Sequence, residues 1–180
     1  DSADDAISSD QARSEFLRRQ ITLLHSRSEY EAALPLGERL LSQLAHQDYT
    51  RGGNLRAHIR EMLQSIAFEA SRDGGPGNYA SMHENHLREV SSYLSSIAYF
   101  CGMDDAIPPV GIKAGLAAKI AHIIRDFAKD VDRGQFNISE EELAAYELDR
   151  SHLGNRGAPP SLAAWVAARA AAAAAAAAPY

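Results

Sequence analysis

The chain has 180 residues, of which 46% are hydrophobic and 23% are charged, and its formal net charge is −6. This length fits one domain with a substantial core, and the apolar fraction is too high for a disordered chain. The acidic balance argues against nucleic-acid binding, and the single cysteine, Cys101, excludes an internal disulfide framework. A chain with one cysteine and no disulfide framework is typical of a reducing compartment, so we expect a cytoplasmic protein. No stretch of about 20 apolar residues that could span a membrane is found in the sequence.

The first half of the chain shows helical periodicity, with apolar residues repeating at three- and four-residue steps. Two shorter helices are expected over residues 11–25 and 36–47, and Pro35 lies between them. A longer helix is expected to begin at Leu55, because Asn54 is placed to cap its start.

Two long helices are expected in the middle of the chain. Ser81 and Glu84 have the spacing of a capping box, which predicts a helix from Ser81 to Gly102. Residues 104–110 include two prolines and are expected to form a loop. A helix over residues 112–129 follows.

The last part of the chain also lacks the alternating pattern of a strand. Ser139 and Glu142 form a second capping box, which opens a short helix through Tyr146. After a proline-containing turn at residues 158–161, an alanine-rich helix is expected from Trp165. The sequence therefore predicts an all-α helical bundle.

The helix over residues 112–129 and its C-terminal end carry a polar stripe. Its members follow one another at steps of four, three, four and four residues, and they therefore share one face: Gly115, Lys119, His122, Asp126 and Asp130. Carboxylates that face a bundle interior are costly unless a cation or hydrogen bonds compensate them. The alternative interpretation is the solvated edge of an amphipathic helix.

Asp1 and Asp5 have the same i, i+4 spacing as Asp126 and Asp130. Two such pairs on facing helices would form an oxygen-ligand site for Mg²⁺, which accepts a few carboxylates together with water and phosphate oxygens. Such a site can hold a diphosphate and stabilise it as a leaving group. Arg125, next to Asp126, could contact the same oxygens.

Three segments resemble the motifs of squalene and phytoene synthases, over about residues 1–150. Residues 125–130, followed by Arg133 and Gly134, resemble the second aspartate-rich motif of this family. Residues 1–5 resemble the first aspartate-rich motif. Between them, Glu89 to Tyr93 with Ile97, Ala98 and Gly102 are similar to the family's pattern on a central helix.

The resemblance implies an isoprenoid-synthase-type helical bundle with a central cavity, and a reaction that couples two prenyl diphosphates. Farnesyl or geranylgeranyl diphosphate is the expected substrate, Mg²⁺ the expected cofactor, and transient contact with a membrane is expected during substrate uptake. The expected metal ligands are Asp1, Asp5, Asp126 and Asp130. The diphosphate would contact Arg125. As a separate hypothesis from the residues themselves, Lys119 would place a cation near the diphosphate, and His122 would act as a base or simply pack. The prenyl tail would lie along Tyr93, Ile97, Ala98 and Gly102.

Four positions depart from the usual residues of this family: Lys119, His122, Gln135 and Asn137. These departures keep two alternatives open, a diverged terpene cyclase or single-prenyl transferase of the same fold, and a non-catalytic assembly or binding factor. Residues 1–180 would form a single helical domain that is incomplete at both ends relative to the family. Separately, His83 and His86 form an i, i+3 pair, without a third metal ligand at a diagnostic spacing.

Overall fold

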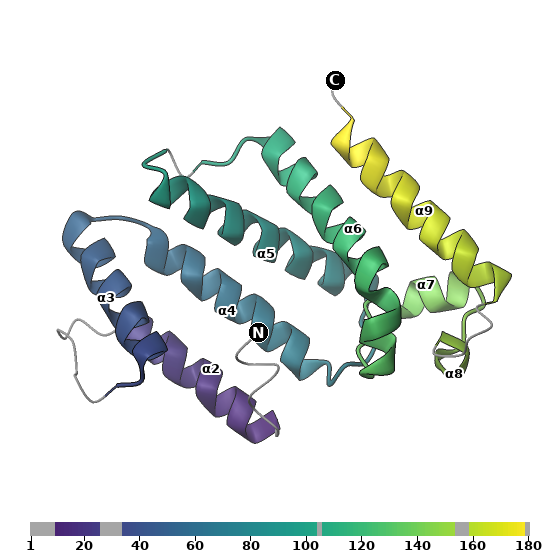
Figure 1. Ribbon diagram of the computed structural model, residues 1–180, viewed down its shortest axis with the longest axis horizontal. Coiled ribbons are helices and arrows are strands. Elements are labelled where there is room, and N and C mark those ends of the chain that lie inside the picture. Colours follow the sequence, from purple (N-terminus) through teal and green to yellow (C-terminus); the bar gives the residue numbers. More distant parts are fainter. Residues whose placement is uncertain (1–9, 26–33, 104–105, 154–158, 179–180) are drawn as a thin grey trace. The chain divides into compact units, whose positions relative to one another are not determined.

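The computed structural model describes residues 10–25, 34–103, 106–153 and 159–178 (Figure 1). Every regular element within these ranges is a helix, which confirms the predicted all-α class. The chain forms two compact units, with unit 1 comprising Asp1–Ser71 and Ser92–Ile107, and unit 2 comprising Arg72–Ser91 and Pro108–Tyr180. Helix α5 contributes its first half to unit 2 and its second half to unit 1.

The described residues of unit 1 form three helices and the second half of a fourth. They are α2 (Asp10–His25), α3 (Leu36–Arg51), α4 (Leu55–Ser71) and α5 (Tyr79–Phe100). Helices α2, α3 and α4 pack against one another in all three pairs. Helix α3 runs four residues beyond its predicted end because Gly52, with φ 66°, forms a left-handed cap there.

The start of α4 is stabilised by a carboxylate on α3. Asp48 is fully buried, and its two oxygens accept hydrogen bonds from the backbone N–H groups of Leu55 and Arg56 at 3.0 and 3.1 Å. The guanidinium of Arg56 donates a further hydrogen bond of 3.1 Å to Asp48. Asp48 therefore satisfies donors at the end of a helix that would otherwise be unpaired.

Replacing Asp48 with alanine is expected to lower the free energy of unfolding by about 2–4 kcal/mol. The change removes a helix cap and leaves part of a buried ion pair uncompensated. Urea denaturation followed by circular dichroism measures the effect, with Asp132→Ala, an exposed aspartate, as the control. Equal stabilities of the two variants would contradict this role of Asp48.

Within the described part of unit 2 lie the first half of α5 and four further helices. They are α6 (Pro109–Asp132), α7 (Glu140–Ala145), α8 (Arg150–Leu153) and α9 (Pro160–Ala177). Helices α6 and α9 lie side by side along much of their length (Figure 1). The rings of Phe127 and Trp165 meet between them, with centroids 4.9 Å apart. These rings belong to an apolar core: Ile123, Phe127, Val131, Ile138, Leu148, Leu153, Leu162 and Trp165.

Three predicted helix starts are wrong, each by a few residues. Helix α9 begins at Pro160, within the predicted turn, instead of at Trp165. Helix α5 begins at Tyr79, and the side-chain oxygen of Asn78 accepts a hydrogen bond of 3.2 Å from the N–H of Ser81. Asn78, rather than Ser81, is therefore the capping residue. Helix α6 begins at Pro109 instead of residue 112, because proline fits the first position of a helix without losing a hydrogen bond.

Backbone hydrogen bonds join the segment that precedes α5 to the segment between α6 and α7 and to the first residue of α7. The N–H of Phe136 donates to the carbonyl of Gly74 at 2.7 Å, and the N–H of Glu140 donates to that of Gly77 at 2.9 Å. Gly74 has φ 70°, and a side chain at this position would collide with the carbonyl oxygen of Gly134. This glycine therefore allows the segment before α5 to lie against the segment that follows α6.

Helix α9 corrects the expectation that no segment could span a membrane. Its 18 residues have a mean hydropathy of 1.2, so by length and composition alone it could cross a bilayer. Its first half nevertheless packs in unit 2, where Leu162 and Trp165 are buried in the core. Arg169 is the single charged residue of this helix.

Candidate functional site: a polar cluster and a cavity in unit 2

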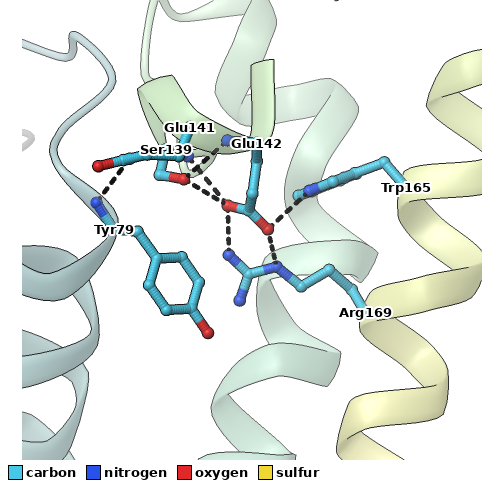
Figure 2. Close-up of polar contacts among 6 residues, drawn as sticks. All are labelled: Tyr79, Ser139, Glu141, Glu142, Trp165 and Arg169. Carbon is cyan, nitrogen blue, oxygen red and sulfur yellow. Dashed lines mark hydrogen bonds and ion pairs between the residues drawn. The ribbon is translucent and has the colours of Figure 1, made fainter. Parts of the chain in front are cut away.

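Glu142 connects the start of α7 to α9 (Figure 2). The capping box predicted with Ser139 is confirmed, since each residue bonds the backbone N–H of the other. The same carboxylate accepts hydrogen bonds from the indole N–H of Trp165 at 3.0 Å and from two nitrogens of Arg169 at 2.6 Å each. A helix cap and a bidentate ion pair thus share one side chain.

The Glu142–Arg169 ion pair is largely removed from solvent. Only 14% of each side chain is exposed. Burial raises the pKa of Glu142, but hydrogen bonds from Arg169, Ser139 and Trp165 outweigh burial, and the pKa lies below its usual value. The guanidinium also lies over the rings of Tyr79 and Trp165, 5.9 and 5.8 Å from their centroids. The carboxylate is therefore charged at neutral pH and held in one geometry.

A partly open cavity of about 340 Å³ lies beside this cluster, lined by residues of α5, α6, α7 and α9. Its polar groups include His86, Lys119, Glu142 and Arg169. Its apolar walls are formed by residues of α6 and α9: Leu116, Ile120, Trp165, Ala168, Ala172 and Ala176. The combination of a few polar groups with apolar walls is typical of small-molecule binding sites.

His86 is the most buried titratable group in the wall of this cavity, with 5% of the residue exposed. Burial, together with the nearby charges of Lys119, Arg169, Arg72 and His83, lowers its pKa to about 3. The imidazole is therefore neutral at pH 7. Its ring makes no hydrogen bond to any part of the chain that the structure describes.

The two histidines of the predicted i, i+3 pair have different surroundings. His86 is buried, whereas His83 is exposed and stacks on the ring of Tyr79, with centroids 6.1 Å apart. Within the described ranges, no three histidine, cysteine, aspartate or glutamate side chains gather into a group that could hold a metal ion. The histidine pair therefore has no third ligand in this part of the chain.

Lys119 connects α6 to α5. Its ammonium group lies 2.7 and 2.9 Å from the two carboxylate oxygens of Glu89, and 27% of its side chain is exposed. Both residues belong to segments that the sequence singled out, but the pairing itself was not predicted. The ion pair places a cation in the wall of the cavity.

The two aspartates of the second acidic motif each have a local partner. Arg125 donates two hydrogen bonds to Asp126, at 2.6 and 2.9 Å, and they lower the pKa of this carboxyl below its usual value. The side-chain amide of Asn137 donates to Asp130 at 3.0 Å. His122, on the same face of α6, is exposed. Asp1 and Asp5 lie outside the described residues.

The four residues expected along the prenyl tail lie in unit 1. Tyr93 and Ile97 are 58% and 43% exposed, whereas Ala98 is buried. Gly102 lies beyond the end of α5, with φ 67°, although the sequence predicted that the helix would reach it. A role for these residues in substrate binding stays a prediction.

Comparison with known proteins does not assign a family, because no protein-family model matches the chain and no curated protein is significantly similar to it. Sequence reasoning missed the roles of Glu142, Arg169 and His86 at the cavity. One signal was available, because a lone charged residue within an alanine-rich helix requires a partner when its face is buried.

Proposed function

We propose that this chain is a Mg²⁺-dependent prenyltransferase that resembles squalene and phytoene synthases and has an isoprenoid-synthase-type bundle with a central cavity. The observation that carries the proposal is a charged face of α6 that continues into the cavity wall. Lys119 lines the cavity, and Asp126 and Asp130 lie about 10 and 16 Å further along the same face.

The two carboxylates suit Mg²⁺ by their chemistry. Asp126 and Asp130 provide oxygen ligands, and the low pKa of Asp126 keeps its carboxyl charged at neutral pH. Arg125 now occupies both oxygens of Asp126, so it would turn toward the substrate when a metal is held there. Asp1 and Asp5 would complete the set of ligands. When bound, the metal supplies Lewis-acid polarisation of the diphosphate oxygens.

The reaction begins when the bond between the first prenyl carbon and its oxygen breaks, and the electron pair leaves with the diphosphate. Lys119 would balance part of the charge on the departing group. The double bond of a second prenyl diphosphate would then attack the allylic cation and lose a proton, which His122 would accept. The apolar walls would keep water away from the cation.

The size of the cavity favours a second candidate. A volume of about 340 Å³ is near the lower end of small-molecule sites, which span roughly 300–1,000 Å³, so it suits one prenyl chain better than two. A cyclase or single-prenyl transferase of the same fold would need only one chain. The products of the reaction distinguish this candidate from a coupling enzyme.

The test is incubation of the purified chain with farnesyl or geranylgeranyl diphosphate and Mg²⁺, with measurement of released diphosphate and of the hydrocarbon product. Asp126→Ala and Asp130→Ala are each expected to lower diphosphate release about 100-fold or more. Asp132→Ala is the matched control, because this exposed aspartate lies on another face of the same helix.

Two results would overturn the proposal. One is the absence of diphosphate release by the unmodified chain with either substrate, which would leave the non-catalytic binding factor as the interpretation. The other is equal activity of the Asp126, Asp130 and Asp132 variants, which would remove the acidic motif from the reaction.

A further inference from the structure

We propose that the cavity of unit 2 binds one prenyl diphosphate in the absence of metal, with His86 and Lys119 at the diphosphate and the alanine face of α9 along the tail. This inference takes its ligand class from the proposed function and assigns the residues that recognise it. It rests on an unpartnered buried side chain, on a cation beside it, and on the shape of the apolar walls.

His86 is a polar side chain that no protein group satisfies. It lines the cavity with 5% of the residue exposed, and its ring has no hydrogen-bond partner in the described part of the chain. A neutral imidazole offers one donor and one acceptor, so its N–H can donate to a phosphate oxygen.

The cations around the cavity retain donors for an anion. An ammonium group has three N–H donors, and the two oxygens of Glu89 engage at most two of those on Lys119. Glu142 accepts from the ε-nitrogen and one terminal nitrogen of Arg169, which leaves the other terminal nitrogen. A diphosphate would therefore find several charge-assisted donors on the polar side of the cavity.

The opposite walls suit a hydrocarbon tail. Ala168, Ala172 and Ala176 follow one another at four-residue steps and form one face of α9. Leu116 and Ile120, also four residues apart, come from α6. No charged group interrupts these two rows, and the small alanine side chains leave room for a chain to lie on α9.

The fluorescence of Trp165 provides the measurement. Trp165 is the only tryptophan of the chain and lines the cavity, so a bound ligand changes its surroundings. The unmodified protein is titrated in EDTA with geranyl, farnesyl and geranylgeranyl diphosphate and with inorganic pyrophosphate. We expect saturable binding of the prenyl diphosphates and at least about tenfold weaker binding of pyrophosphate, because pyrophosphate buries no apolar surface.

The head group is tested with His86→Leu, which is expected to weaken binding about 10-fold or more, the effect of one hydrogen bond to a charged group. His86→Gln, which keeps a hydrogen-bond donor, should recover most of the affinity. Thermal unfolding is measured in parallel. Because His86 has no protein hydrogen bond to lose, the leucine variant should melt no lower than the unmodified protein, whereas a purely structural histidine would lower the melting temperature.

The tail is tested with Ala172→Phe, which places a ring in the cavity wall. Ala171→Phe is the matched control, because both alanines are exposed residues of α9 but only Ala172 lines the cavity. We expect the phenylalanine at position 172 to weaken binding of geranylgeranyl diphosphate at least about tenfold, and that of geranyl diphosphate less, since the shorter chain needs less room.

Three results would overturn the inference. They are the absence of metal-free binding by the unmodified protein, equal affinity for pyrophosphate and prenyl diphosphates, and variants at 86 and 172 that bind as the unmodified protein does. Turnover with Mg²⁺ but no metal-free binding overturns this inference alone. Metal-free binding without turnover supports the cavity as a binding site and overturns the proposed enzymatic function alone.

Discussion

Replacing Glu142 with glutamine is expected to lower the free energy of unfolding by about 3–5 kcal/mol. The change leaves the guanidinium of Arg169 largely buried without its bidentate partner, and such uncompensated charges are strongly destabilising. It also weakens the capping box at the start of α7. Urea denaturation followed by circular dichroism at pH 7 measures the change.

The control for Glu142→Gln is Glu140→Gln. Glu140 also lies in the first turn of α7, so it has a similar position relative to the helix dipole, but it is exposed. Its replacement should change stability by less than about 1 kcal/mol. If Glu142→Gln were no more destabilising than this control, the ion pair with Arg169 would not contribute to the stability of unit 2.

The stability of the protein is expected to decrease by about 3–5 kcal/mol as the pH falls from 6.5 to about 3, because of His86 alone. Its pKa is about 3 in the folded protein and 6.5 in the unfolded chain. In this interval the unfolded chain binds a proton that the folded protein excludes, so acid favours unfolding. Above pH 6.5 the imidazole is neutral in both states and its contribution is constant.

Urea denaturation at a series of pH values measures this effect, with the variant His86→Gln as the comparison. Protonation of carboxylates such as Glu142 also lowers the free energy of unfolding in acid. This effect is the same in both proteins, so the difference between the two curves is the contribution of His86. His122→Gln is the control, because this histidine is exposed on α6. Parallel curves for the unmodified protein and His86→Gln would show that burial does not suppress protonation of His86.

Local patterns predicted the elements of this fold well. The periodicity of apolar residues and the capping box of Ser139 and Glu142 depend on neighbours within one or two turns, and the structure confirms both the helices and this box. Helix starts were less accurate where the capping group was overlooked, as at α5, where Asn78 rather than Ser81 caps the helix. The start of α4 was predicted correctly, but the contribution of Asp48 was not, because this residue bonds N–H groups seven and eight positions later, beyond the range of a capping motif.

The candidate site was predictable only in part, for a related reason. Helical spacing alone placed Lys119, Asp126 and Asp130 on one face of α6. Their partners could not be predicted, since Glu89 lies on another helix and Asn137 follows α6 in the chain. The cavity depends on four helices at once, so the burial of His86 has no signature in the residues around it.

The anchoring of Arg169 has a consequence for the rotation of α9. From residue 170 to 177 the helix consists of alanine, so turning or sliding it would present an identical surface to α6. Such a surface contains no information about register. The register of α9 is set instead by Trp165 and Arg169, which are both bonded to Glu142 and determine which alanines face the cavity. Without the bonds from Trp165 and Arg169 to Glu142, α9 would sample several registers of similar energy. A ligand site that needs one alanine face would then be an average over several arrangements of α9.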